Sequence, residues 1–480
     1  RATVRPPTPE SKMPIGAFRV GWLTSLSLTL TPFDTDRQPA QITRLKPVLN
    51  TTALLTDRYE LTMLQAARHS GKAERPAVFE VFTRSLPAGR RYGVVAGTGR
   101  LLEAIKNFKF NPDDLDWLRR EGVVDAETLE WLADYKFSGN IWGYREGEIY
   151  FPNSPILIVE APFAEAVLLE TLVISVLNFD SAVASAASRM INAAGGRRTA
   201  EMGSRRANET AAVAAARAAY VAGFDATSNL EAGRTWGVPT MGTAAHAFTL
   251  LHDSEEQAFR AQVETFGPGT TLLVDTFDIE AGVRNAVAAA GTKLGAVRLD
   301  SGDLPVEVAR VRKLLDELGA VDTKITVTND LDEFAIAALA AAPVDAYGVG
   351  TSVVTGSGSP TAGFVYKLVA VEDEDGQQRS VAKTSAKKGN VGGRKFALRR
   401  RDEHGVAVAE IIGAGHHPDE ARTDRELLEP LIIAGEIQEQ FVGIAGTALA
   451  REHHALVKNE LPLQALRLGR GEAAIPTIFV

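Results

Sequence analysis

Five short polar motifs, each directly after an apolar run typical of a β-strand, hold most of the side chains that could do chemistry. They are 201–206 (Glu-Met-Gly-Ser-Arg-Arg), 242–246 (Gly-Thr-Ala-Ala-His), 275–278 (Asp-Thr-Phe-Asp), 298–303 (Arg-Leu-Asp-Ser-Gly-Asp) and 328–330 (Thr-Asn-Asp). In a barrel of alternating strands and helices, the loops after the strands open on one face, where catalytic residues lie. The pattern therefore predicts that these motifs converge on one site and that the chain is an enzyme.

The types of these residues narrow the chemistry. His246 could accept a phosphoryl group, act as a general base or bind a ligand. Asp275 ends an apolar strand, where a carboxylate is costly unless it meets a cation, a histidine or a hydroxyl. Arg298 can hold a carboxylate or phosphate through two hydrogen bonds, and Asp300 with Asp303 could bind Mg²⁺ or ribose hydroxyls. The alternative for each is a structural role, and we expect Asp303 to be mainly a helix cap.

Two further features indicate an anionic ligand. Arg205 lies after the second expected strand, and a solvated surface is its alternative role. Gly348, Gly350 and Thr351 lie after the eighth expected strand, where barrels often build a phosphate site from backbone N–H groups. No GxxxxGK[ST] loop occurs, so a P-loop nucleotidase is excluded as the main interpretation.

The elements that must position these motifs alternate regularly from about residue 155. The eight expected strands are 156–160, 199–202, 224–227, 238–242, 271–275, 296–299, 324–328 and 345–349. The expected helices between them are 208–222, 255–266, 279–290, 305–318 and 331–340, with Ser254 and Asp330 as N-caps. This order predicts an α/β fold with an irregular parallel (β/α) barrel.

The flanks have a different pattern. Residues 46–154 mix helices and strands, and residues 356–480 contain antiparallel strand patterns, including a hairpin over 364–383. We expect them to pack together as an α+β sandwich domain beside a barrel spanning 155–355. Residues 1–45 lack periodicity and are predicted to be a disordered or non-native extension.

Composition excludes several classes of protein. The net charge of −8 argues against nucleic-acid binding. The chain has no cysteine, which excludes disulfides, thiolate nucleophiles and cysteine metal sites. The most apolar stretch, 161–179, is interrupted by two glutamates, so we expect no membrane span.

The motifs, taken together, resemble those of nicotinate phosphoribosyltransferases. The resemblance rests on four segments in family order: 54–63 (Leu-Leu-Thr-Asp-Arg-Tyr-Glu-Leu-Thr-Met), 242–246, 298–303 and 383–395. It runs from about Leu54 to the end of the chain. A set of motifs in one order is far more specific than any of them alone.

The resemblance implies a reaction and its partners. Nicotinate and 5-phosphoribosyl-1-pyrophosphate would give nicotinate mononucleotide and pyrophosphate, a step of NAD salvage. ATP would be a co-substrate, hydrolysed through a phosphohistidine, and Mg²⁺ would be the cofactor, with ligands that the sequence does not identify. The resemblance also implies a cytoplasmic homodimer with shared active sites.

The resemblance further implies roles for individual residues. His246 would be the phosphorylated histidine, and Asp275 would be its neighbouring carboxylate. Asp300 would be the third catalytic residue and would stabilise charge at the ribose. Tyr59, with Asp57, would reach into the neighbouring subunit's site.

Other residues are expected to bind substrates. The substrate-binding set is completed by Arg205, Arg298, Ser228 and Thr243. The phosphate-binding set is Asn329, Asp330, Gly348, Gly350 and Thr351.

One position departs from the family pattern, and one argues for the acid substrate. Met202 stands where the family more often has a phenylalanine that stacks on the pyridine ring, although a thioether can also pack on an aromatic face. Enzymes that use nicotinamide place an acidic residue after the third strand, whereas this chain has Ser228 and Asn229 there, with Glu231 nearby.

The rival hypotheses are a nicotinamide or quinolinate enzyme of the same architecture, and a non-catalytic barrel that has kept only the fold.

Overall fold

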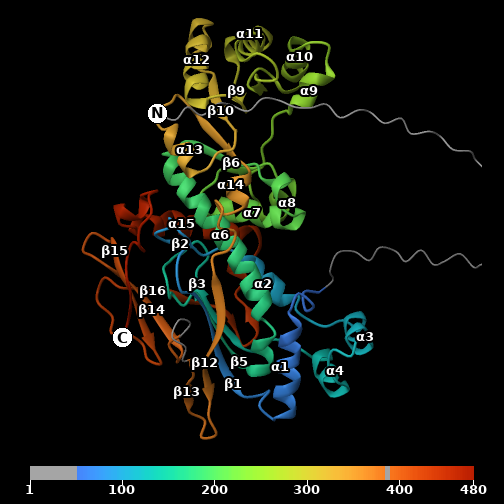
Figure 1. The fold of residues 1–480 in the computed structure, drawn as a ribbon, viewed down its shortest axis with the longest axis vertical. Coiled ribbons are helices and arrows are strands. Elements are labelled where there is room, and N and C mark those ends of the chain that lie inside the picture. Colours follow the sequence, from blue (N-terminus) through green and yellow to red (C-terminus); the bar gives the residue numbers. More distant parts are fainter. Residues whose placement is uncertain (1–50, 384–389) are drawn as a thin grey trace, which may run out of the picture. The chain divides into compact units, whose positions relative to one another are not determined.

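The structure, a computed structural model, describes residues 51–383 and 390–480 (Figure 1). These described residues form one compact unit. The prediction for residues 1–45 lies outside the described residues. The boundaries predicted inside the compact unit, at 154/155 and 355/356, stay a prediction.

A six-stranded sheet, parallel throughout, carries most of the polar motifs. Its strands, in spatial order, are β7 (Ala226–Thr227), β6 (Arg198–Glu201), β11 (Ala346–Val349), β10 (Lys324–Val327), β9 (Ala296–Leu299) and β8 (Thr271–Leu273). The sheet is curled into an open half-barrel. The mixed α/β class that the sequence predicts is therefore confirmed.

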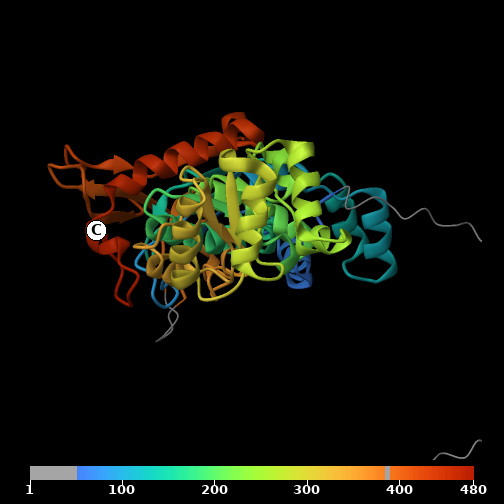
Figure 2. The same ribbon diagram turned by 90° about the horizontal axis from the view of Figure 1, so that it is seen from above.

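Alternation along the strands separates two faces of this sheet. Val297, Leu299, Ile325 and Val327 are fully buried in one core with the surrounding helices. Residues between them, such as Arg298, point to the opposite, inner face because successive side chains alternate. This core includes residues of helices α7 (Glu209–Val221), α10 (Glu255–Phe266), α11 (Ile279–Ala290), α12 (Leu304–Glu317), α13 (Glu333–Ala338) and α14 (Thr351–Val354). Helix α8 (Leu230–Trp236) packs against α7, and α9 (His246–Leu251) packs against α10. Seen from above, α10, α11 and α12 are nearest to the viewer (Figure 2).

Of the eight expected barrel strands, one lies in a different sheet and one is reduced to a single parallel bridge at the edge of the half-barrel. The run 156–160 lies in β5 (Leu157–Pro162), which pairs antiparallel with β1 (Pro76–Thr83) and β3 (Asn140–Tyr144) in a different sheet. The run 238–242 makes a single bridge, from Thr240 to Thr227. A short apolar run has the same pattern in a parallel strand and in any other buried strand, so periodicity could not separate them.

A seven-stranded sheet combines strands from both flanks of the chain. Its order is β13 (Gln378–Ser380), β12 (Phe364–Glu372), β1, β5, β3, β17 (Leu428–Ile433) and β18 (Glu436–Ile437). The predicted hairpin is β12 with β13. A four-stranded sheet has the order β16 (Arg425–Glu426), β14 (Lys395–Arg401), β15 (Ala407–Ala414) and β19 (Thr477–Phe479), and a small sheet pairs β2 (Gly93–Val94) with β4 (Ile149–Tyr150).

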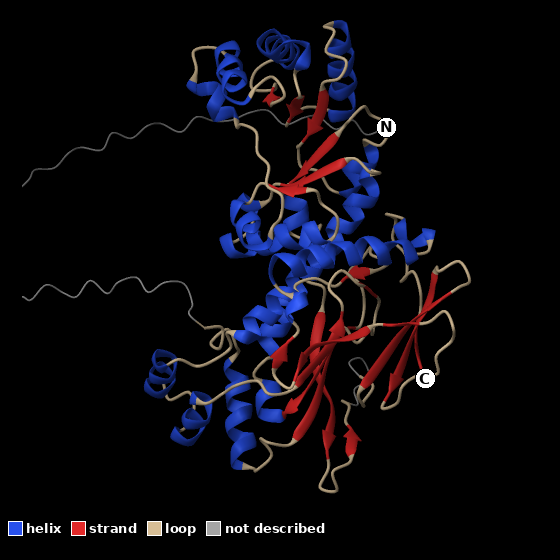
Figure 3. Ribbon diagram, turned by 180° about the vertical axis from the view of Figure 1, so that it is seen from behind, coloured by secondary structure: helices blue, strands red, loops and turns tan. Residues whose placement is uncertain are grey.

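Helices pack on these sheets and between them (Figure 3). They are α1 (Arg58–His69), α2 (Thr98–Lys106), α3 (Pro112–Arg120), α4 (Ala126–Ala133), α5 (Phe163–Val167), α6 (Glu170–Ala194) and α15 (Gly443–Val457). The first half of α6 is buried in the core of the seven-stranded sheet, and its second half is buried in the core of the half-barrel. Helix α6 therefore joins the two cores.

Helix α6 is also long and apolar enough to span a membrane, judged by length and composition alone. Its most apolar window is 72% buried inside the protein. A buried core helix passes the same test, so the finding is weak.

Capping residues set where the half-barrel helices begin. Ser254 caps α10 by accepting a hydrogen bond from the backbone N–H of Gln257, as predicted. The predicted cap Asp330 is wrong, because Asp332 accepts from Phe334 and Ala335 at the start of α13. Asp330 instead has a positive φ of 34°.

Candidate active site

The carboxyl-terminal edge of the half-barrel gathers five predicted side chains into what we call the polar cluster. Its members are Thr243, His246, Asp275, Arg298 and Asp300. They come from loops after β8 and β9, from β9 itself and from the segment that leads into α9. The expectation that distant motifs converge is met for this group.

Asp275 is the anchor of the polar cluster. Its side chain is 1% exposed. One carboxylate oxygen, Oδ2, accepts hydrogen bonds from the backbone N–H of Asp300 and the hydroxyl of Ser301, both at 2.7 Å. The other oxygen, Oδ1, is buried, and in the described residues it has no hydrogen-bond partner. An unpaired buried carboxylate oxygen is costly, so it marks a place for a ligand, a proton or a cation.

Arg298 is held at three of its atoms. Nε donates to Thr328 Oγ1 at 3.1 Å, and Nη1 donates to Thr243 Oγ1 at 3.0 Å and to the carbonyl of Ala244 at 3.2 Å. Nη2 lies 3.6 Å from Asp300 Oδ2. The guanidinium is thereby fixed in orientation, with a positive edge turned toward Asp300.

Asp300 lies between the arginine and the histidine. Its Oδ1 accepts a hydrogen bond from Thr328 Oγ1. Its side chain is 34% exposed, which leaves the carboxylate accessible to a substrate. A carboxylate held this way can stabilise positive charge that develops on a bound sugar.

His246 opens helix α9 and has different surroundings at its two ring nitrogens. Nδ1 shares a 3.1 Å hydrogen bond with Thr276 Oγ1. Nε2 lies 4.0 Å from Asp275 Oδ1 and 4.0 Å from Asp300 Oδ2. Asp275 is therefore a neighbouring carboxylate of the histidine at ion-pair distance, and the hydrogen bond to the ring is made by Thr276.

A second group of polar residues surrounds the end of β6. Glu201 is fully buried and accepts from the Thr227 hydroxyl at 2.6 Å and from the backbone N–H of Gly203. Burial raises the pKa of Glu201, and these two hydrogen bonds act in the opposite direction. Ser228, the residue after Thr227, is exposed and donates its backbone N–H to the carbonyl of Glu201.

Met202 and Gly348 line the inner face below the polar cluster. A Cβ atom on Gly348 would lie 2.6 Å from Thr328 Cγ2 and 2.8 Å from the Met202 sulfur. Glycine at this position therefore makes room for both side chains. A cavity of about 1120 Å³ extends along the inner face from Met202 toward the start of the strands, past Thr326 and Arg198.

The remaining predicted residues lie outside the polar cluster. Arg205 is exposed in the short helix Ser204–Arg206, and in the described part of the chain its side chain has no hydrogen-bond or ion-pair partner. Of the predicted phosphate-binding residues, Asn329 and Asp330 follow β10, Gly348 is in β11, and Gly350 and Thr351 follow β11. Within the described part of the chain, none of them makes a hydrogen bond or ion pair with the polar cluster.

Tyr59 lies on helix α1 and Asp57 is the N-cap residue of that helix, which Figures 1 and 3 draw well away from α9 and β9. Tyr59 is 44% exposed. Partial burial, together with Glu170 beside it, raises the pKa of Tyr59 to about 12. These two residues do not join the polar cluster of their own chain.

Sequence reasoning did not single out four polar residues that the structure ties to the site. Thr276, Ser301 and Thr328 hold the histidine, Asp275 and Asp300, and Glu201 closes the end of β6. All lie inside the polar motifs, so their position was a usable signal. A hydroxyl beside a charged residue gives no pattern that identifies its partner.

Comparison with known proteins identifies close relatives. Residues 54–178 match the family model for the nicotinate phosphoribosyltransferase (NAPRTase) N-terminal domain. The nicotinate phosphoribosyltransferase pncB1 of Mycobacterium tuberculosis is 56% identical over 433 residues, which cover 88% of this chain and 94% of that relative. The nicotinate phosphoribosyltransferase of Bacillus subtilis is 39% identical and covers 70% of each chain.

A solved structure agrees with these sequence matches. The human nicotinic acid phosphoribosyltransferase has a TM-score of 0.76 at 25% identity, covering 88% of this chain and 97% of that one. The curled parallel sheet with a polar carboxyl-terminal edge is that of an α/β half-barrel enzyme of the phosphoribosyltransferase class. Within that class, the chain belongs to the nicotinate phosphoribosyltransferase family.

Proposed function

We propose that this enzyme transfers the 5-phosphoribosyl group of 5-phosphoribosyl-1-pyrophosphate to nicotinate, with ATP hydrolysis, as a cytoplasmic step of NAD salvage. The observation that carries the proposal is the placement of Arg298, Asp300 and Asp275 around His246 in a chain 56% identical to a relative of that name. The rival hypothesis of a non-catalytic barrel has no support here. Such a protein would be recognised by the loss of His246, Asp275 or Asp300, and all three are present and lie in the polar cluster.

The glycosyl transfer needs a group that stabilises charge at the sugar. The pyridine nitrogen of nicotinate bonds to C1 of the ribose while the C1–O bond to pyrophosphate breaks, and its electrons leave with the pyrophosphate. Positive charge builds on the ribose, and Asp300 is held by Thr328 where it can offset that charge. Arg298 supplies the cation for the nicotinate carboxylate.

The energy coupling is assigned to His246. A ring nitrogen attacks the γ-phosphorus of ATP, the bond to ADP breaks, and water later hydrolyses the phosphohistidine. The carboxylates of Asp275 and Asp300, each 4.0 Å from Nε2, favour a proton on that nitrogen. The other nitrogen then keeps its lone pair and can act as the nucleophile.

Mg²⁺ fits the donors available at this edge. Asp275 Oδ1 is buried without a hydrogen bond, and Asp300 is next to it. Carboxylate oxygens are the ligands that Mg²⁺ prefers, so these two residues would hold it. When bound, the ion offsets the negative charge of the pyrophosphate leaving group.

The reaction can be tested directly by following pyrophosphate release. Purified enzyme is incubated with 5-phosphoribosyl-1-pyrophosphate and nicotinate, nicotinamide or quinolinate, each with and without ATP. The proposal expects nicotinate to be the best acceptor and ATP to accelerate the reaction. Release that depends on quinolinate or nicotinamide alone would support the rival acceptors instead.

Nicotinate should be preferred to nicotinamide because Arg298 and Arg205 can pair with its carboxylate. A charge-assisted hydrogen bond is worth roughly 1.5–3 kcal/mol. That energy corresponds to a preference in kcat/KM of roughly 10- to 150-fold. Equal or higher kcat/KM for nicotinamide would show that this model of the pocket is wrong.

The same preference can be reduced at Ser228, which is exposed after β7 and neutral. Ser228→Asp should lower kcat/KM for nicotinate more than for nicotinamide, because it adds like charge near an anionic acceptor. Ser228→Asn, similar in size but uncharged, is the matched control and should keep the preference. An unchanged ratio in Ser228→Asp would place this residue outside the acceptor site.

Tyr59 should serve an active site in the partner subunit of a homodimer, because its helix α1 lies away from the polar cluster of its own chain. Mixing Tyr59→Ala chains with His246→Ala chains, neither of which should catalyse ATP-coupled synthesis alone, should then restore ATP-coupled synthesis. If the two chains pair at random, about half of the dimers are mixed and each mixed dimer has one intact site, so about a quarter of all active sites are intact. Activity is measured after subunit exchange is verified with two differently tagged chains, and no recovery after that exchange would argue for sites within one chain.

A further inference from the structure

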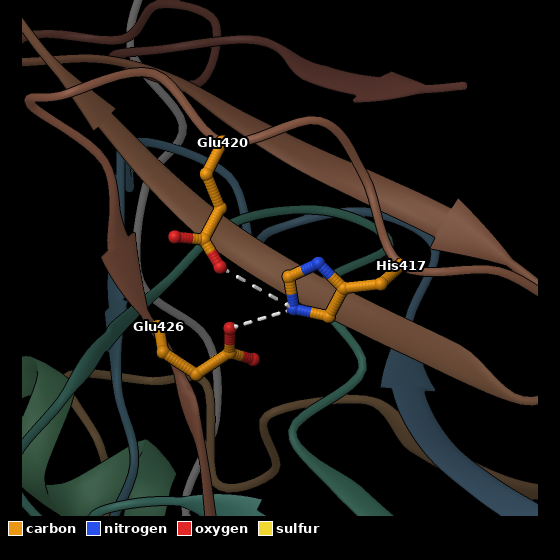
Figure 4. Close-up of side chains that lie close together, drawn as sticks. All are labelled: His417, Glu420 and Glu426. Carbon is orange, nitrogen blue, oxygen red and sulfur yellow. Dashed lines mark hydrogen bonds and ion pairs between the residues drawn. The ribbon is translucent and has the colours of Figure 1, made fainter.

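A second cluster of metal-ligating side chains lies on the four-stranded sheet, far from β9 (Figure 1). His417 and Glu420 are on the loop between β15 and β16, and Glu426 is on β16 itself (Figure 4). His417 Nε2 lies 3.0 Å from Glu426 Oε2 and 3.9 Å from Glu420 Oε1. One ligand atom from each residue lies within 4.8 Å of the others.

The histidine ring of this cluster is held by contacts that do not involve the glutamates. It meets the ring of Phe396 on β14 edge-on, with centroids 5.4 Å apart. Its Nδ1 lies 2.9 Å from the carbonyl oxygen of Pro418. The loop that carries it is closed by Asp424, which accepts from the backbone N–H of Ala421 at 2.9 Å and is paired with Arg400.

The Pro418 contact determines which nitrogen is free to bind a ligand. A carbonyl oxygen only accepts hydrogen bonds, so Nδ1 must carry a proton and donate it. In the neutral ring the lone pair is then on Nε2, which faces two carboxylate oxygens. A positive charge must lie among these three electron-rich atoms, either as the proton that Nε2 shares with Glu426 or as a metal ion in its place. A carbonyl that orients the ring through its other nitrogen is also the usual arrangement behind a metal-bound histidine.

We propose that His417, Glu420 and Glu426 bind a divalent transition-metal ion of the Zn²⁺ type. Bonds of about 2.1 Å to a tetrahedral ion separate the ligand atoms by roughly 3.4 Å. The present separations of 3.0 and 3.9 Å lie on either side of that value. The side chains are 40%, 65% and 44% exposed, so water can complete the coordination.

The chemistry of the donors separates this site from the Mg²⁺ site proposed at the polar cluster. An imidazole nitrogen suits Zn²⁺, whereas Mg²⁺ prefers oxygen ligands and keeps its waters. A bound ion would tie the loop to strand β16 at the edge of the sheet. Its expected effect is therefore on stability, with no change in the catalysed reaction.

The test is calorimetric titration of the untagged enzyme with Zn²⁺ in the presence of excess Mg²⁺. The chain has no cysteine, so thiolates do not compete for the ion. Wild type should bind one more Zn²⁺ per chain than His417→Ala, and the melting temperature should rise with Zn²⁺ only where that ion binds. Loss of an outer-shell partner already weakens metal sites by about 10- to 100-fold, so removing the nitrogen ligand should exceed about 100-fold.

Three further variants make the result specific. Glu426→Gln keeps the size of the side chain and should weaken the same binding step. His69→Ala removes an exposed histidine that, among the described residues, faces a single carboxylate, Asp125 at 2.6 Å, and should leave the step intact. His246→Ala should also keep it, which separates this site from the polar cluster. A Zn²⁺ titration that is the same in wild type and His417→Ala would overturn the proposal.

Discussion

Replacing His246 by alanine is expected to abolish phosphoenzyme formation and ATP hydrolysis while leaving slow, ATP-independent synthesis of nicotinate mononucleotide. The histidine lies 4.0 Å from both Asp275 and Asp300 and is bonded to Thr276, so it is placed to carry a phosphoryl group. Arg298 and Asp300, which are assigned to the glycosyl transfer, keep their bonds to Thr243 and Thr328 without it. Coupling should therefore be lost completely and transfer only in part.

The measurement uses ATP labelled at the γ-phosphate, followed by detection of acid-labile phosphate on the protein and of product with and without ATP. His252→Ala is the matched control, because His252 ends the same helix and its Nδ1 is bonded to the carbonyl of Phe248. That variant should behave as wild type. Acid-labile phosphate on the His246→Ala protein would remove His246 from its assigned role.

Replacing Asp300 by asparagine is expected to lower kcat by at least about 100-fold, the scale of losing one preorganised electrostatic contact. Asparagine has nearly the same shape and keeps an oxygen that can accept from Thr328, so the fold should be unaffected. It lacks the negative charge that faces the ribose and Arg298. A 100-fold loss corresponds to about 2.7 kcal/mol of transition-state stabilisation.

Asp303→Asn is the control for this experiment. Asp303 lies three residues on, is exposed, and occupies the N-cap of α12 without a side-chain capping bond. Its substitution should change kcat little, and melting temperatures of both variants should match wild type. If Asp300→Asn changed kcat by less than about threefold, Asp300 would be a structural residue.

Local pattern was enough to predict many individual elements. Helix α11 spans the expected residues 279–290, and strand β12 with its hairpin partner β13 lies within the predicted hairpin 364–383. Strands β9 and β11 end at the expected residues. These elements follow from neighbours in sequence, since side-chain period and turn residues act over a few positions.

Pairing of distant strands was not determined in this way. The run 156–160 has the composition of a barrel strand, yet it lies between β1 and β3 in the antiparallel sheet. Both faces of this strand would be buried in the half-barrel and in the antiparallel sheet alike, so its pattern of apolar residues does not distinguish the two sheets. Helix α6 likewise gave no sign that one half would pack in each core.

The amino-acid sequence by itself determined the class of fold, the family, and the set of residues with reactive side chains at strand ends. Strand period and turn chemistry are local, and they place polar residues after apolar runs whatever the surroundings. Only the tertiary structure decided which of them touch: Asp275 with Ser301, Asp300 with Thr328, and His246 with Thr276. It also separated Tyr59 from that group. Such contacts depend on strand register and on hydroxyl groups from distant loops. Neither of these produces a periodic pattern in the amino-acid sequence.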